Sequence, residues 1–371
     1  MKRHYSPKKS PEKKVRSRSR TPSSPPPAPP APSDFIPLSI RPLNPPSKDL
    51  PPWIRPNTMS FADANLQLHE EILDFFDFMQ PSSSDLSSRE EVISRMKKIA
   101  KDLWENSEVS VFGSFETGLW LPNSDLDLLV LTGTNEKPED LINNFAFSIC
   151  KLGMASEMDR ILSATVPILK MKDKKTGIYL DICFNIENGL QGVGVVKEYL
   201  AKYPQAKYLV CVVKYFLKQR GLNDTYSGGI GSFLLFCMVI SSIQQHPALR
   251  AERKNYARFT LGHYLMYFLK LFGEELNYET TGISIRGEGA FFKKSSKNWT
   301  YFDRENFLAV ECPQNQENDL GKSSYSIELV KKAFSHAYKI LCSQNKRIAK
   351  TPLSMVVRID ELILSRIQTN D

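Results

Sequence analysis

The sequence decides its fold at two stretches, residues 111–115, VFGSF, and residues 125–131, DLDLLVL. The first reads as a short strand that ends in Gly113 and Ser114, and the second as an apolar strand with two acids at its start. Backbone N–H groups and the hydroxyl of a Gly-Ser turn can hold phosphate oxygens. A Gly-Ser pair alone is also common in an ordinary strand-to-helix turn. Its combination with the two spaced acids favours a functional site.

Three acids lie in or beside apolar strands. Asp125 and Asp127 flank Leu126, and side chains at positions i and i+2 of a strand point to the same face. Asp181 lies inside the apolar run IYLDICF at 178–184, where a charge is costly unless it is paired or bound to a metal. If the two strands are neighbours, the three carboxylates converge on a site suited to Mg²⁺. We therefore predict all three acids as catalytic residues and metal ligands, with Mg²⁺ or Mn²⁺ as the cofactor.

Strands and helices alternate around these stretches and predict a unit with a mixed β-sheet. Two helices are expected before it, one at 61–79 and one that begins at Ser87 with a capping box to Glu90. Another helix is expected at 139–152. The expected strands are 109–112, 126–131, 164–172 and 178–184.

From residue 194 the apolar pattern is mostly helical. The run at 233–243 is too short to span a membrane, and we interpret it as a buried helix. The predicted fold class is α+β, a mixed-sheet domain followed by a helical domain. Helices are expected at 194–202, 205–220, 230–245, 257–272, 326–342 and after Pro352.

The first 57 residues are rich in Pro and Ser and have almost no periodic apolar pattern, so we predict a disordered tail. The first 20 residues hold nine of the 49 basic residues and one of the 41 acids, so the net charge of +8 belongs to this tail. Basic clusters beside Ser-Pro sites indicate nuclear targeting. The alternative is a solvated basic tail that carries no targeting signal. The charge-balanced remainder gives little sign of nucleic-acid affinity of its own.

The six cysteines form no CxxC pair, which argues against a zinc site. Most of them lie in apolar segments, where a free thiol packs as a small apolar group. This distribution fits a reducing compartment.

At the Gly-Ser pair, the Asp-x-Asp pair and the later Asp, the chain resembles the DNA-polymerase-β-like nucleotidyltransferase superfamily. It is further similar to the Trf-type noncanonical poly(A) polymerases, which act on nuclear RNA. That likeness rests on LDICFN at 180–185, GGIGSF at 228–233 and NDLGKSSY at 318–325. It covers about residues 58–345 and implies a nucleotidyltransferase domain beside a helical, PAP-associated central domain, with a cleft between them.

The resemblance implies a set of nucleotide-binding residues. Lys214 and Lys218 match the lysines that bind the triphosphate, and their i, i+4 spacing places both on one helical face. Ser232 matches a phosphate contact and Phe233 an aromatic that stacks under the base. The full predicted set is Gly113, Ser114, Asn188, Gly189, Lys214, Lys218, Ser232, Phe233, Asn318 and Asp319.

The same resemblance implies ATP as the nucleotide. Asn188 and Gly189 would line the ribose and base, and Asn318 and Asp319 would read the base edge. Uridylyl-transferring relatives usually carry His where Asn318 stands. The chain departs from the family at Cys312, where an Asp is common before Pro, and this departure leaves nucleotide choice less constrained than catalysis.

The implied activity is template-independent addition of AMP to RNA 3′ ends, by a polynucleotide adenylyltransferase that tails nuclear RNAs for processing or exosome decay. The expected location is the nucleus, including the nucleolus. The expected small-molecule and nucleic-acid partners are ATP and an RNA 3′ end. The expected protein partners are a zinc-knuckle RNA-binding protein and an RNA helicase in a TRAMP-like complex. No association with a membrane is expected. Alternatives are a terminal uridylyltransferase, an enzyme that accepts several NTPs, or an inactive homologue that serves as an RNA-binding or scaffolding subunit.

The resemblance also implies boundaries between the parts of the chain. The ordered part would begin with an N-terminal helix that packs on the central domain. A short C-terminal helix or tail would end the chain. The predicted parts are 1–57 for the tail, 58–82 for the N-terminal helix, 83–190 for the catalytic domain, 191–345 for the central domain and 346–371 for the C-terminal segment.

Overall fold

The computed structural model describes most of the chain after residue 49. The predicted disordered tail, apart from residues 50–55, lies outside the described residues, as do the side chains of residues 188–190. The described ranges are 50–55, 58, 63–164, 166–186, 188–247, 259–300, 305–343 and 351–369.

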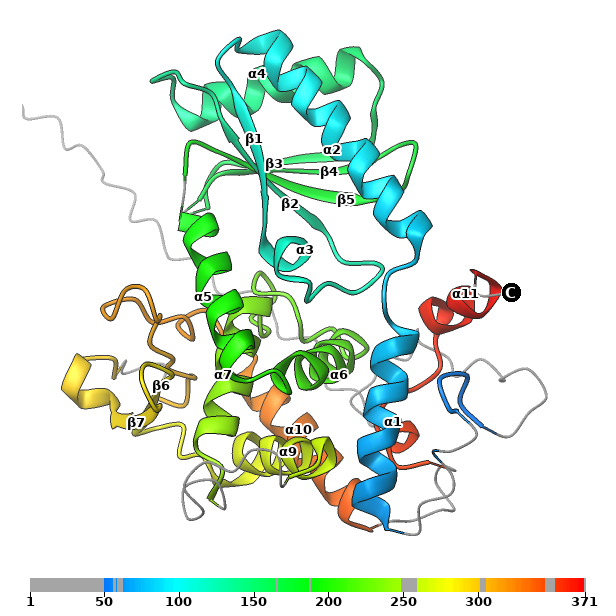
Figure 1. The fold of residues 1–371 in the computed structure, drawn as a ribbon. Coiled ribbons are helices and arrows are strands. Elements are labelled where there is room, and N and C mark those ends of the chain that lie inside the picture. Colours follow the sequence, from blue (N-terminus) through cyan, green and yellow to red (C-terminus); the bar gives the residue numbers. More distant parts are fainter. Residues whose placement is uncertain are drawn as a thin grey trace, which may run out of the picture. The chain divides into compact units, whose positions relative to one another are not determined.

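A five-stranded mixed sheet carries the predicted acids (Figure 1). Its order is β1-β2-β5-β4-β3; β2 and β5 are parallel, and the other neighbours are antiparallel. The mixed sheet confirms the prediction. The strands are β1 (Glu108–Phe112), β2 (Leu126–Leu131), β3 (Ala155–Ile161), β4 (Ile168–Asp173) and β5 (Tyr179–Phe184).

Strand β3 was not predicted. It is an edge strand whose side chains are mostly half-buried or exposed, so its sequence, ASEMDRI, lacks the apolar alternation of a half-buried strand. The strand predicted at 164–172 begins instead at Ile168, directly after Pro167, which has no N–H group to donate to the sheet.

The predicted capping box was also wrong. Helix α2 (Ser83–Leu103) begins one turn earlier than Ser87, and its cap is Ser82, whose side chain accepts from the N–H of Asp85. Both positions fit the same pattern of Ser followed three residues later by an acid, so the pattern alone was ambiguous by about one helical turn.

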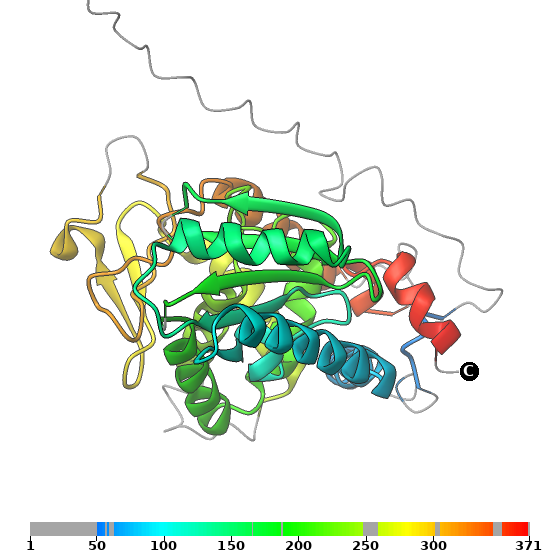
Figure 2. The same cartoon turned by 90° about the horizontal axis from the view of Figure 1, so that it is seen from above.

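Helices α2 and α4 (Pro138–Lys151) cover one face of the sheet, as seen from the side in Figure 1 and from above in Figure 2. Along β2, Leu126, Leu128 and Val130 belong to the core on this face. Because side chains alternate, Asp127 lies on the opposite face of the sheet. The packing of α2 and α4 on one face of the sheet therefore leaves the opposite face, which carries Asp127, available for the site.

The helical part has its own apolar core, and its helices lie within a few residues of the predicted ranges, except that the helix predicted at 194–202 begins six residues earlier, at Asn188. Helix α1 (Ala64–Phe78) packs against α6 and α9, and α7 is buried along almost its whole length, as predicted for the run at 233–243. The central helices are α5 (Asn188–Lys202), α6 (Ala206–Lys218), α7 (Ser232–Gln244), α9 (Leu261–Lys270) and α10 (Ile327–Ser343).

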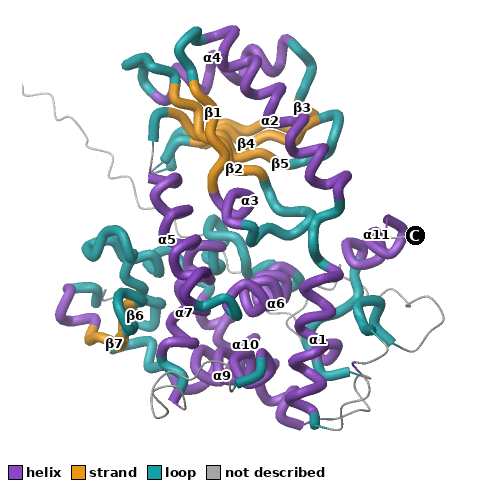
Figure 3. The backbone as a smooth tube through the Cα atoms, viewed as in Figure 1, coloured by secondary structure: helices purple, strands orange, loops and turns teal. Residues whose placement is uncertain are grey.

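The remaining elements are short. A hairpin of β6 (Thr281–Ser284) and β7 (Ala290–Lys293), which was not predicted, contacts α7 through β6 (Figure 3). The C-terminal segment forms a 3-10 turn at Leu353–Met355 and helix α11 (Glu361–Thr369). Within the described part of the chain, no helix is both long and apolar enough to cross a membrane.

A buried ion pair joins α2 to the sheet. The guanidinium of Arg95 donates to both oxygens of Asp173 at 2.7 and 2.9 Å, and the side chain of Asp173 is fully buried at the end of β4. Thr176 donates its N–H and its hydroxyl to the same carboxylate, which shapes the turn before β5. The pair therefore fixes the hairpin that carries Asp181.

We expect Arg95→Ala to lower the free energy of unfolding by about 3 kcal/mol, because it leaves a buried carboxylate without its cation. The matched control is Lys175→Ala, which removes an exposed ion pair to Glu91 on the same helix and should cost less than about 1 kcal/mol. Urea unfolding followed by circular dichroism measures both. Equal losses in the two variants would contradict this assignment.

Candidate active site

The parallel pairing of β2 with β5 places Asp127 directly beside Asp181 in the register. Both side chains are half-buried and project from the face opposite α2 and α4. Burial raises the pKa of Asp127 to about 7, and the charges of Asp181 and Asp125 add to the rise. The condition that the sequence left open, that the two acidic strands are neighbours, is met.

Asp125 lies just before β2 and is exposed. Its charge acts on both of the other acids, since it contributes to the raised pKa of Asp127 and of Asp181. The three predicted acids thus form one electrostatic cluster.

Lys170 was missed by the sequence analysis. It is the register partner of Asp181 across β4 and β5, and its Nζ donates to Asp181 Oδ2 at 2.8 Å. Burial raises the pKa of Asp181, although the bond from Lys170 opposes the rise. In the sequence, Lys170 is marked only by its position in the alternating pattern of β4. That position indicates a contact with Asp181 only once β4 is known to pair with β5.

The donor set fits a divalent cation of the Mg²⁺ type, because such ions prefer carboxylate oxygens and keep several waters and phosphates as ligands. Crowded carboxylates with a raised pKa, as at Asp127, are stabilised in their ionised form by a nearby cation. Within the described residues, no three Asp, Glu, His or Cys side chains lie close enough together to form a complete metal site as they stand, and Asp181 is bonded to Lys170.

Gly113 directly follows β1 and has φ of +67°. A Cβ atom at this position would overlap the Oδ2 atom of Asp127, because Phe112 is the register partner of Asp127. Ser114 follows in the short helix α3 (Gly113–Thr117). Glycine is therefore required here both by the backbone conformation and by the close approach of the carboxylate.

The loop that leads from α3 to Asp125 is held by cations from two sides. Lys214 Nζ donates to the carbonyl of Leu119 at 3.1 Å, and Lys218 Nζ donates to that of Asn123 at 3.2 Å. On the other side, Arg89 of α2 donates to the carbonyls of Pro122 and Ser124 and stacks over the ring of Trp120 at 4.2 Å. These contacts fix the loop that ends at Asp125, just before β2.

Lys214 and Lys218 thus reach the same loop from one face of α6, as their spacing indicated. Lys214 is buried, which lowers its pKa to about 8 even though the charge of Asp127 opposes the shift. A buried amine next to acidic groups is suited to hold anionic oxygen atoms.

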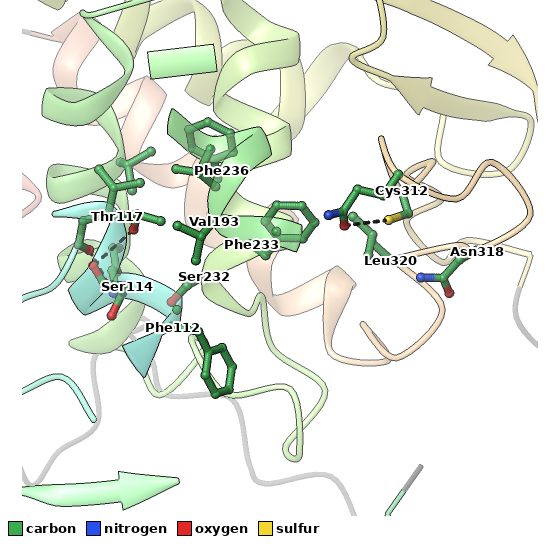
Figure 4. Close-up of a pocket in the computed structure, with 17 residues that line it drawn as sticks. Phe112, Ser114, Thr117, Val193, Ser232, Phe233, Phe236, Cys312, Asn318 and Leu320 are labelled. Carbon is green, nitrogen blue, oxygen red and sulfur yellow. Dashed lines mark hydrogen bonds between the residues drawn. The ribbon is translucent and has the colours of Figure 1, made fainter. Parts of the chain in front are cut away.

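Figure 4 shows a pocket of about 330 Å³. None of the three acids lines it, but Gly113, against which Asp127 lies, is one of its lining residues. Ser114 and Thr117 lie at one end and Cys312 and Asn318 at the other, with Phe233 between them. Six of the predicted nucleotide-binding residues line it: Gly113, Ser114, Lys214, Ser232, Phe233 and Asn318.

Other predicted residues lie outside its lining. Lys218 reaches only the loop described above. Asp319 is buried, and its Oδ1 accepts from the N–H groups of Val310 and Gly321 at 2.9 and 2.8 Å. The structure therefore places Asp319 as a support of the loop that carries Asn318. Asn188 and Gly189 begin α5, and their side chains are not described.

The pocket also includes polar residues that the sequence did not single out as ligand contacts. Thr117 lines the Ser114 end, and Gln314 lines the other end, where the Sγ of Cys312 lies 3.8 Å from its Oε1. Cys312 was noted only as a departure from the family pattern. Gln314 gave no signal, because a polar residue in a loop is ordinary until the loop folds over a pocket.

Known protein families match both parts of the chain. Residues 68–201 match the model described as "Poly(A) RNA polymerase, mitochondrial-like, central palm domain", and residues 260–318 match "Cid1 family poly A polymerase". Poly(A) RNA polymerase cid14 of Schizosaccharomyces pombe is 33% identical over 299 residues, which are 79% of this chain and 43% of that protein. Poly(A) RNA polymerase protein 2 of Saccharomyces cerevisiae is 32% identical over 278 residues, 74% of this chain and 47% of that protein.

This chain belongs to the Trf-type noncanonical poly(A) polymerases. The resemblance noted in the sequence is thereby confirmed. The chain spans less than half the length of these two relatives. One further relative, from Drosophila melanogaster, is named an inactive member, Trf4-2; it is 29% identical over 330 residues, 85% of this chain and 79% of that protein.

Solved structures agree with this family assignment. The polymerase core of TRAMP, an RNA surveillance complex, is 27% identical with a TM-score of 0.75, and the match covers 83% of this chain and 99% of that one. The Cid1 poly(U) polymerase with Mg and 3′-dATP shares the fold, with a TM-score of 0.64 and 20% identity. The match covers 75% of this chain and 95% of that one. The α+β nucleotidyltransferase fold class is therefore confirmed.

We expect Gly113→Ala to lower kcat at least about 100-fold, because the new methyl group displaces the Asp127 carboxylate from its place. The matched control is Gly118→Ala, where φ is +71° but nothing lies within 4 Å of the new Cβ. The left-handed backbone should cost each variant about 1–2 kcal/mol of stability, and the overlap with Asp127 adds to the loss in Gly113→Ala, which alone should lose nucleotide transfer. Comparable activities in primer extension would contradict the steric role.

Proposed function

We propose that this chain adds AMP units from ATP to the 3′ ends of RNA without a template. The observation that carries the proposal is the position of Asp127. It is the register partner of Asp181, it is coupled to the charge of Asp125, and it lies against Gly113 at the edge of a pocket lined by Ser114 and Lys214. Carboxylates at one side and an ammonium and a hydroxyl at the other suit a reaction in which a hydroxyl attacks a triphosphate.

Asp125, Asp127 and Asp181 are the residues that would hold divalent cations. Mg²⁺ or Mn²⁺ bound there would favour ionisation of the RNA 3′ hydroxyl and neutralise charge on the departing pyrophosphate. Lys170 would hold the Asp181 carboxylate in its orientation toward the strand face.

The pocket residues would position the nucleotide. Lys214 and Ser114 hold triphosphate oxygens, and the lowered pKa of Lys214 reflects burial that strengthens such contacts. Phe233 stacks on the base, which gives affinity without identity. Lys218 keeps its place on the loop before Asp125, so that its charge adds to the field around the triphosphate.

The base edge would meet two amides, those of Asn318 and Gln314. Amide groups can pair with the donor and acceptor of adenine together. Asn188 and Gly189 keep their predicted roles at the ribose and base, and Asp319 contributes by holding the loop of Asn318. Transfer of UMP, or of several nucleotides, is the second candidate, favoured by the absence of the family's acid at Cys312.

The substrate and partner assignments follow from the relatives. The folded part is charge-balanced, so stable RNA capture would come from a partner, as in the TRAMP complex to which one similar polymerase core belongs. We propose a zinc-knuckle RNA-binding protein and a helicase as those partners, nuclear RNAs as substrates, and the nucleus as the location. The named inactive relative makes catalysis the property to test first.

The first test replaces the acids one at a time. We expect Asp125→Ala and Asp127→Ala each to lower extension of a labelled oligoadenylate primer by ATP to below about one-thousandth, because charge on the triphosphate is then left without its metal. The control is Asp159→Ala, an exposed acid of β3 on the same sheet, which should keep full activity. Primer extension by an Asp127→Ala variant at the wild-type rate would overturn the proposal.

The second test concerns the base. With each of the four NTPs in turn, we expect ATP to give the highest kcat/KM. Asn318→His should move the ATP to UTP ratio toward UTP by about tenfold or more, because it changes the group at the base edge. The control is Gln316→His, an exposed position of the same loop that does not line the pocket. An unchanged ratio in Asn318→His would contradict the assignment of base reading to this loop.

A further inference from the structure

Tyr226 has no role in the site described above, yet it is the most exposed large apolar side chain in the described part of the chain, at 86%. It lies in the loop 222–231 that joins α6 to α7. A single exposed aromatic residue is common on protein surfaces, so exposure alone carries little.

The backbone that presents Tyr226 is firmly held. Its N–H donates to Asp224 Oδ1 at 3.1 Å, and its carbonyl accepts from the hydroxyl of Tyr325. Ser326 binds the same loop twice, through its hydroxyl to the carbonyl of Ser227 at 2.8 Å and through its N–H to that of Gly228 at 3.0 Å. These bonds join positions about a hundred residues apart in the sequence.

Gly228 reinforces this arrangement. It has φ of +77°, and a Cβ atom there would overlap the ring of Tyr325. The loop and the start of α10 are therefore packed as closely as a backbone without side chain allows. The Tyr226 hydrogen bonds all use its backbone, so the ring is presented to solvent on a fixed support.

The loop leads directly into Ser232, which lines the pocket, and the charge of one of its residues reaches the acids. The charge of Asp224 acts on Asp181 and on Lys170, which form the ion pair of β4 and β5. At the other end of the loop, the Thr225 Cγ2 atom lies 2.7 Å from where a Cβ atom of Gly231 would be, next to Ser232 of the pocket. The loop thus connects the nucleotide pocket with the Asp181 side of the site.

We propose that Tyr226 is a stacking platform for a base at the 3′ end of the acceptor RNA. The proposal rests on the proposed function, in which the RNA hydroxyl is the attacking group. Tyr226 does not line the nucleotide pocket, where Phe233 supplies the aromatic face for ATP. A fixed, exposed ring on the Asp181 side is available to the other substrate, and stacking accepts any base, as an enzyme that extends many RNAs requires.

A chain without a strongly basic folded surface gains most from such a contact. The sequence outside the first 20 residues is balanced in charge, so its net charge gives no long-range attraction to backbone phosphates. Base stacking supplies affinity that does not depend on charge and is less sensitive to salt. It also orders the last nucleotides of a single strand before attack.

The test uses the full chain with Mg²⁺ and a 5′-labelled oligoadenylate. In Tyr226→Ala, we expect KM for the primer to rise about tenfold, within the range of about 5- to 150-fold for loss of one stacked base, while KM for ATP stays within twofold. Tyr226→Trp should restore primer KM, since it keeps an aromatic face. The matched control is Phe147→Ala, an exposed aromatic of α4 on the other face of the sheet from the acids, which should leave both constants unchanged.

Unchanged primer KM in Tyr226→Ala would overturn the proposal, and so would a parallel rise in both constants, which would indicate a disturbed pocket. Failure of the wild-type chain to extend any primer would instead overturn the proposed function. In that case, equilibrium binding of the labelled oligoadenylate by fluorescence anisotropy still decides the question: equal affinities of wild type and Tyr226→Ala would exclude stacking. Weaker binding of a partner protein with unchanged RNA binding would identify Tyr226 as a protein contact and likewise overturn the proposal.

Discussion

The parallel pairing of β2 with β5 is the constraint on which the site depends. It places Asp127 beside Asp181 in the register, and the other three strand pairs of the five-stranded sheet are antiparallel. A shift of one residue would turn one of these acids into the core, because side chains alternate between the faces. The core under α2 and α4 fixes the register, since it requires Leu126, Leu128 and Val130 on its own side.

Around this pair, the site is assembled from segments far apart in sequence. Lys214 of α6 is bonded to the loop before Asp125, and the pocket is completed by Phe233 of α7 and by Asn318. The three acids and the pocket residues of the helical part therefore belong to different cores, which are joined by hydrogen bonds from Lys214 and Lys218 to backbone carbonyls, while Gly113 and Ser114 lie on the side of the acids. Such an arrangement lets the helical part change its base contacts without disturbing the acids, and it accounts for relatives of one fold that differ in their nucleotide.

Several features followed from local patterns and others did not. The mixed sheet, the buried helix α7 and the shared face of Lys214 and Lys218 were predicted because each depends on periodicity over a few residues. Strand β3 was missed because an exposed edge strand needs no apolar alternation. The sequence could not show that Asp319 binds backbone amides rather than lining the pocket. An aspartate in the motif is the same residue type whether it contacts the base or supports the loop.

The sequence by itself determined the chemistry that is available: a Gly-Ser turn, three acids in apolar strands and the motifs of a polymerase family, because these depend on residue type and spacing. Only the tertiary structure decided which groups meet. It paired Lys170 with Asp181, directed Asp319 to the support of a loop, and tied the backbone of Tyr226 to Tyr325. The physical reason is that register, burial and loop contacts are set by packing between segments a hundred or more residues apart, which no local pattern encodes.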